Sequence, residues 1–199
     1  MPLEPDKPYT LSDGTVFTIL TDRDSATDSP RNYDGNIGTM VCFHSRYNLG
    51  DEHEYRKQSF DSWEELKQEI RKDHRPLVIL NLYLFDHSGL AISTSPFLCP
   101  WDSGQVGFIY ATRELVEKNW GWELPKKLGS ADRVRIVREL NEEVKLYDQW
   151  QYGDTWGYSL KTPANNVLDS CFGFFGLDLE TNGMLDHLPN KYHAELRAL

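Results

Sequence analysis

The chain has 199 residues, of which 39% are hydrophobic and 13% aromatic, and its formal net charge is −10 at pH 7. This length suggests one domain or at most two small ones, and this hydrophobic content excludes disorder over most of the chain. The excess of 31 acidic over 21 basic residues disfavours direct binding to nucleic acid, and no run of about 18 apolar residues is present to cross a membrane.

The N-terminal sequence "MPLEPDKPYT" lacks the basic start and the apolar stretch of a secretory signal. The three cysteines, Cys42, Cys99 and Cys171, are widely spaced and odd in number, which argues against a disulfide framework. We therefore expect three reduced thiols in a cytoplasmic protein. The sequence does not indicate an oligomeric state.

Residues 1–36 are expected to be loosely ordered with one strand, "TVFTIL", and residues 37–199 to form a single α+β domain. The segment "IGTMVCFH" (37–44) is typical of a strand. A helix is predicted over 61–73, because Ser62 and Glu65 fit a capping box and the apolar residues that follow share one helical face.

The most apolar run, "PLVILNLYLF" (76–85), predicts a central strand that is buried on both faces. The turn "DHSG" (86–89) and the strand 90–95 follow at once, which favours an antiparallel hairpin. A third strand is expected over 105–112, and Thr112 is placed to cap a short helix, "RELVEKNW".

The longest helix is predicted from Ser130 to about Tyr152. Its apolar residues repeat at spacings of three and four and should face the sheet; they include Val134, Val137, Leu140, Val144 and Tyr147. Two strands (155–162 and 169–179) and a partly helical tail follow. The whole pattern predicts an α+β fold with a largely antiparallel sheet and two or three packed helices.

Polar and reactive side chains gather in loops at the predicted strand ends, where a rigid sheet can position them. If the strand at 105–112 is antiparallel to its neighbours, the loops 44–51, 86–89 and 93–105 converge on one edge of the sheet and line one polar pocket. The candidate binding residues are His44, Arg46, Tyr47, Asp51, Asp86, His87, Ser95, Trp101, Asp102 and Gln105.

Three kinds of chemistry remain open at these loops. Cys171 in "DSCFGF" has the small and aromatic neighbours of some cysteine nucleophiles. Asp86, His87 and Asp102 could act as an acid and a base. His44, His87 and Asp102 are candidate ligands of a divalent metal, although no metal-binding motif is present and no cofactor is predicted.

Several segments together resemble a family of small, functionally uncharacterised proteins encoded by phages and prophages. The resemblance covers residues 33–176 and is most specific in "DHSG" and "CPWDSGQVGFIY". It implies expression inside an infected bacterium, from genes often devoted to host takeover or to evading host defence.

We therefore expect an accessory protein that binds and modulates a host protein, such as a defence or nucleic-acid-handling factor. The acidic balance supports this hypothesis, because an acidic surface attracts a basic groove. Two alternatives stay open: a small hydrolase or nucleotide-processing enzyme that uses the loop histidines and aspartates, and a binder of a small nucleotide signal that uses aromatic residues and Arg46.

Overall fold

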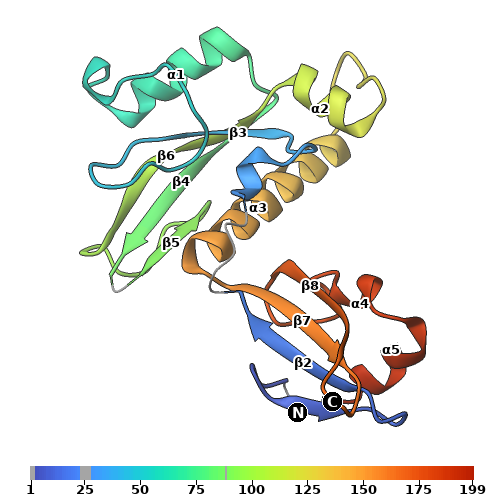
Figure 1. Cartoon of the computed structure of the whole chain (residues 1–199). Coiled ribbons are helices and arrows are strands. Elements are labelled where there is room, and N and C mark those ends of the chain that lie inside the picture. Colours follow the sequence, from blue (N-terminus) through green and yellow to red (C-terminus); the bar gives the residue numbers. More distant parts are fainter. Residues whose placement is uncertain (1–2, 23–27, 88) are drawn as a thin grey trace. The chain divides into compact units, whose positions relative to one another are not determined.

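A computed structural model describes residues 3–22, 28–87 and 89–199 of the chain. They form two compact units, one made of Met1–Asp28 with Gln149–Leu199 and the other of Ser29–Asp148 (Figure 1). Helices and antiparallel strands occur in both units, which confirms the α+β class. Within the described ranges, no helix is both long and apolar enough to cross a membrane.

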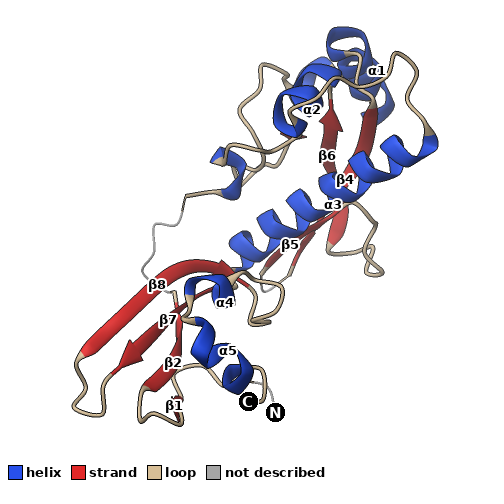
Figure 2. Cartoon of the chain, turned by 90° about the vertical axis from the view of Figure 1, so that its right-hand side faces the viewer, coloured by secondary structure: helices blue, strands red, loops and turns tan. Residues whose placement is uncertain are grey.

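The unit that contains both ends of the chain is a four-stranded antiparallel sheet with two short helices (Figure 2). Its strands, in spatial order, are β1 (Pro8–Thr10), β2 (Val16–Thr21), β7 (Thr155–Lys161) and β8 (Val167–Phe175), and its helices are α4 (Met184–His187) and α5 (Asn190–Leu196). Phe17 and Ile19 of β2 and Tyr158 of β7 are buried against the apolar side chains of the two helices. The alternating pattern of β2 therefore places one face of the sheet in a core.

The larger unit contains the second four-stranded antiparallel sheet, and its elements position every candidate site residue except Cys171. Its strands, in spatial order, are β3 (Gly38–Cys42), β6 (Ser103–Ala111), β4 (Val78–Asp86) and β5 (Leu90–Ser93). Its helices are α1 (Trp63–His74), α2 (Arg113–Trp120) and α3 (Ser130–Tyr152), with the 3-10 turns η1 (Pro30–Asn32) and η2 (Lys57–Ser59). Helix α1 and helix α3 cover opposite faces of this sheet (Figure 1).

Helix α1 begins as its sequence predicts. The Ser62 side chain accepts a hydrogen bond from the Glu65 N–H at 3.2 Å, and the Glu65 carboxylate accepts one from the Asp61 N–H at 2.8 Å. Leu66 and Ile70 of this helix are buried against side chains of β3 and β6. The capping box and the apolar face thus fix both the start and the orientation of α1.

The apolar face of α3 differs from the predicted one in its second turn. Leu140, Val144 and Tyr147 are buried as expected, but Val134 is 68% exposed and Ile136 is buried instead. A helix presents a stripe wider than one row of residues, so spacing alone allows a rotation of the face by one or two positions.

Strand β4 lies inside its sheet as predicted, between β5 and β6, and both pairings are antiparallel. It is not buried on both faces along its length: Leu82 and Leu84 are buried, whereas the other residues from Val78 to Asp86 are half-buried. An antiparallel sheet does not need the continuous cover that a parallel sheet receives from its crossover helices.

The division of the chain differs from the expected boundary at residue 36. Residues 8–10 and 16–21, which we expected to belong to a loosely ordered segment, form β1 and β2, and β2 pairs with β7 from Val16 to Thr21. The strands also form two sheets rather than one. Pairing between the two ends of a chain leaves no local pattern in the sequence, because the partners are about 140 residues apart.

Candidate functional site

The sheet brings the 86–89 and 93–105 loops together at one edge, as the strand order predicts. Strand β4 ends at Asp86 next to the beginning of β6, where Phe85 is paired with Ser103. The Asp86 N–H donates to the Asp102 carbonyl at 2.8 Å, one step beyond this pair. Ser88, in the turn that follows, lies outside the described residues.

The 44–51 loop reaches the same edge through His44 and Arg46. The Arg46 guanidinium forms an ion pair with the Asp86 carboxylate, and His44 Nε2 lies 3.9 Å from the same carboxylate oxygen. The ring of Tyr47 stacks on the ring of His44, with 4.8 Å between their centroids. The Arg46 guanidinium lies over the Tyr47 ring, 5.3 Å from its centroid. The prediction that the three loops converge is therefore confirmed.

A second polar group lies beside the first. His87 Nδ1 is 3.4 Å from Asp102 Oδ2, and the thiol of Cys99 donates to the same oxygen at 3.5 Å. Both groups therefore contact the carboxylate. A cysteine nucleophile needs a thiol that contacts a histidine base, with the carboxylate behind the histidine. At Asp102, by contrast, the carboxylate lies between the thiol and the imidazole and contacts both.

The loop from Thr94 to Asp102, here called the presenting loop, carries two large apolar side chains into solvent. Leu98 is 103% exposed and Trp101 is 92% exposed. The loop is nevertheless anchored: the Phe97 ring packs on Phe85 at 5.8 Å, and the Ser103 hydroxyl donates to the Cys99 carbonyl at 2.5 Å.

Other predicted site residues have different surroundings. Asp51 accepts hydrogen bonds from the Arg31 guanidinium and from the Met40 N–H, so it holds the loop to β3. The Ser95 N–H donates to the Ser93 hydroxyl at 3.0 Å. Cys171 lies on β8, opposite Tyr158, in the unit that holds both chain ends.

One cavity takes in part of the set of residues that was expected to line a single polar pocket. A cavity of about 690 Å³ is lined by residues of the 42–58 segment, among them His44, Tyr47 and Asp51. Its lining does not include Asp86, His87 or Asp102. The Asp86, His87 and Asp102 side chains, which are 22%, 66% and 37% exposed, lie next to the presenting loop.

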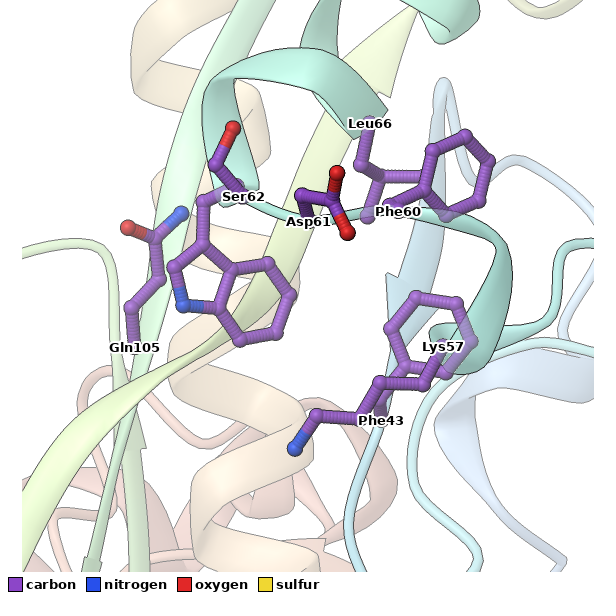
Figure 3. A pocket seen from close by; sticks show the side chains of 8 residues that line it. Phe43, Lys57, Phe60, Asp61, Ser62, Leu66 and Gln105 are labelled. Carbon is purple, nitrogen blue, oxygen red and sulfur yellow. The ribbon is translucent and has the colours of Figure 1, made fainter.

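Sequence reasoning missed a cavity of about 270 Å³ at the start of α1 (Figure 3). Its lining residues are Phe43, Lys57, Phe60, Asp61, Ser62, Trp63, Leu66 and Gln105. Of the residues that line it, only Gln105 was among the predicted binding residues, and it was expected in another pocket. The signal was present in "SFDSWEE", where aromatic residues flank the helix cap on both sides. The capping box explains the serine but does not require either ring.

The surroundings of the cysteines determine how reactive their thiols are. All three cysteines are free, and burial raises the pKa of the Cys42 thiol to about 12. A thiol of this kind stays protonated near neutral pH and is a poor nucleophile.

Over residues 3–22, 28–87 and 89–199, no three histidine, cysteine, aspartate or glutamate side chains are grouped to hold a metal ion.

Comparisons with family models, with curated proteins and with solved structures find no match for this chain.

Proposed function

We propose that the protein is a binding protein that engages a basic surface of a partner protein through its presenting loop. The observation that carries this proposal is the exposure of Leu98 and Trp101 on a loop whose base is fixed by the Phe97 and Ser103 contacts. Burying these two side chains against a partner would release the water that covers them.

The composition of this surface suits a protein interface. Tryptophan is among the residues that contribute most to binding when it fills a pocket on a partner. Polar side chains around such a centre form a rim that favours the correct partner, and here the Arg46–Asp86 and His87–Asp102 pairs lie beside the loop. The net charge of −10 favours a basic partner, because complementary charge speeds association.

The resemblance to phage proteins adds the expectation that the partner belongs to an infected bacterium, in its cytoplasm, and that its inhibition benefits a phage. A basic groove that normally holds nucleic acid is the surface of this kind that an acidic protein would occupy. We therefore propose that the partner is such a host protein and that binding it serves host takeover or the evasion of host defence.

The alternative of a hydrolase has less support from the site. The Cys99 thiol and the His87 imidazole each contact the Asp102 carboxylate, and Cys42 is buried with a raised pKa. This arrangement holds side chains in place but does not activate a thiol as a nucleophile.

A comparison of variants tests the binding function. The wild-type protein and the variants Leu98→Ala and Trp101→Ala are used to capture proteins from phage-infected cells, and the captured partner is then purified for calorimetry. We expect one basic protein to bind the wild type and each variant to weaken its affinity at least tenfold. Raising the salt concentration should also weaken the wild-type complex.

Trp122→Ala provides the matched control, because this ring is 49% exposed but lies outside the presenting loop. Its complex should have wild-type affinity. Equal affinities for the wild type, Leu98→Ala and Trp101→Ala would contradict the proposal, as would a purified partner that does not bind the wild type directly.

A further inference from the structure

The cavity at the start of α1 has a floor of rings and apolar side chains and charged groups at its mouth. Leu66 is buried and Trp63 half-buried, whereas Asp61 and Lys57 are exposed. Its volume of about 270 Å³ is slightly below the range of roughly 300–1,000 Å³ that is typical of ligand pockets. This size suits one planar ring system with its polar substituents outside.

The aromatic side chains of the floor are held by other rings. Trp63 lies 6.3 Å from Phe43 and meets Phe108 edge-on at 6.2 Å, while Phe60 meets Tyr55 at 6.1 Å. Rings that are fixed in this way lose little freedom when a ligand packs on them. They offer a preformed surface for a flat aromatic group.

Two charged groups at the mouth are available to a ligand. Figure 3 shows the Asp61 carboxylate pointing into the space between the lining side chains, with the Lys57 ammonium across the space from it. In the part of the chain that the structure describes, neither Asp61 nor Lys57 forms a salt bridge. Each charge can therefore pair with a ligand without breaking an ion pair.

The start of α1 is not itself an anion site. The Glu65 carboxylate accepts from the Asp61 N–H, and the Ser62 hydroxyl accepts from the Glu65 N–H. Side chains of the helix thus satisfy these backbone donors. The Asp61 carboxylate remains as an acceptor that is directed at the cavity.

We propose that this cavity binds a free guanine mononucleotide. The base packs on the rings of the floor, the Asp61 carboxylate accepts from the N1–H and the 2-amino group of the base, and the Lys57 ammonium binds the phosphate. A carboxylate accepts hydrogen bonds but cannot donate them. Guanine is the common base whose Watson–Crick edge presents two adjacent donors, whereas adenine and cytosine place a ring-nitrogen acceptor beside their amino group.

The pair of opposite charges distinguishes this ligand from two others. A cationic side chain would satisfy Asp61 and stack on the rings, but Lys57 would repel it. A single-stranded nucleic acid would also stack its bases, but the net charge of −10 opposes its many phosphates. A mononucleotide places one phosphate group at one lysine.

This inference is separate from the proposed partner-binding function. None of the residues of the presenting loop lines this cavity. Arg46, which the sequence suggested for nucleotide binding, pairs with Asp86 and is not part of the cavity lining either. Nucleotide binding and partner binding can therefore succeed or fail independently.

Calorimetric titration of the full chain with GMP, AMP, CMP, UMP and guanosine tests the proposal. We expect GMP to bind at least tenfold more tightly than AMP. Asp61→Asn should weaken GMP binding at least tenfold. Lys57→Ala should reduce GMP affinity to that of guanosine and leave guanosine binding unchanged, because guanosine carries no phosphate.

Glu54→Gln is the control for charge, since Glu54 is exposed and does not line the cavity, and it should bind GMP like the wild type. Leu98→Ala should do so too, which separates this result from the partner-binding test. The proposal is overturned if the four nucleotides bind equally, if Asp61→Asn has wild-type affinity, or if millimolar GMP shows no saturable heat. Tighter binding of N-acetylarginine amide or of a guanine-rich oligonucleotide would overturn it as well.

Discussion

The guanidinium of Arg31 donates to the carboxylate of Glu143 at 2.7 Å, although 112 residues separate the two in the sequence. The same guanidinium binds both carboxylate oxygens of Asp51, and its side chain is only 4% exposed. Glu143 in turn accepts from the Ile37 N–H at 2.6 Å. One buried cation thus joins the segment before β3, the loop after β3 and helix α3.

This network predicts a large loss of stability for Arg31→Met. The variant would leave the Asp51 and Glu143 carboxylates half-buried without their counter-ion, which typically costs about 3–5 kcal/mol in the free energy of unfolding. Urea unfolding should measure the change. Arg138→Met is the control, because this arginine is exposed on α3, the helix that carries Glu143, and its change should stay within about 0.5 kcal/mol. A similar cost for both variants would contradict the structural role of Arg31.

The face of α3 can be tested in the same way. Leu140 is fully buried, so Leu140→Ala should lower the free energy of unfolding by about 2–5 kcal/mol. Val134 is 68% exposed, so Val134→Ala should change it by less than about 0.5 kcal/mol. If Val134→Ala were the more costly change, Val134 would be buried against the sheet, as the sequence pattern first suggested.

The three thiols should differ in their reaction with an alkylating reagent at pH 8. Cys99 and Cys171 are partly accessible and should be modified in the folded protein. Cys42 is buried, and its pKa of about 12 keeps it protonated, so it should react only after unfolding. Mass spectrometry of the intact protein should show two modifications before denaturation and three after it. Early labelling of Cys42, or a pair of oxidised cysteines, would contradict this prediction.

The contact between α5 and the turn at Asp13 should depend on pH. The ammonium of Lys191 and the Thr15 N–H hold the pKa of the Asp13 carboxyl well below its usual range. A lowered pKa in the folded state stabilises the protein above the ordinary carboxyl value of about 4, and this contribution is lost as the pH falls through the folded value. The difference in Tm between the wild type and Asp13→Asn should therefore be larger at pH 7 than at pH 3. Asp34→Asn, at an exposed position, should show no such trend.

Substitutions at the polar rim should affect binding more than stability. The His87 and Asp102 side chains are 66% and 37% exposed, and exposed pairs contribute about 0–1 kcal/mol to folding. His87→Ala and Asp102→Ala should therefore unfold within a few degrees of the wild type in a thermal scan and still bind the proposed partner more weakly. A large fall in Tm for both would identify them as structural residues of the turn.

The sequence by itself determined the order of the elements, because local signals define them. The capping box at Ser62, the Thr112 cap of α2 and the long periodic pattern of α3 each act over a few residues. The short connection after β4 determined an antiparallel hairpin with β5, and the antiparallel pairing of β6 placed Asp102 next to Asp86. This edge of the sheet was predictable because strand direction and loop length dictate which ends meet.

Only the tertiary structure decided which loop residues act together and where the chain divides. Asp51 was expected at the site, but the buried guanidinium of Arg31 binds it. The rings that line the cavity beside Trp63 come from the residue after β3, from the loop before α1 and from α1 itself. The pairing of β2 with β7 joins residues from the two ends of the chain. Such contacts depend on desolvation and packing between distant segments, and neither leaves a periodic pattern in the sequence.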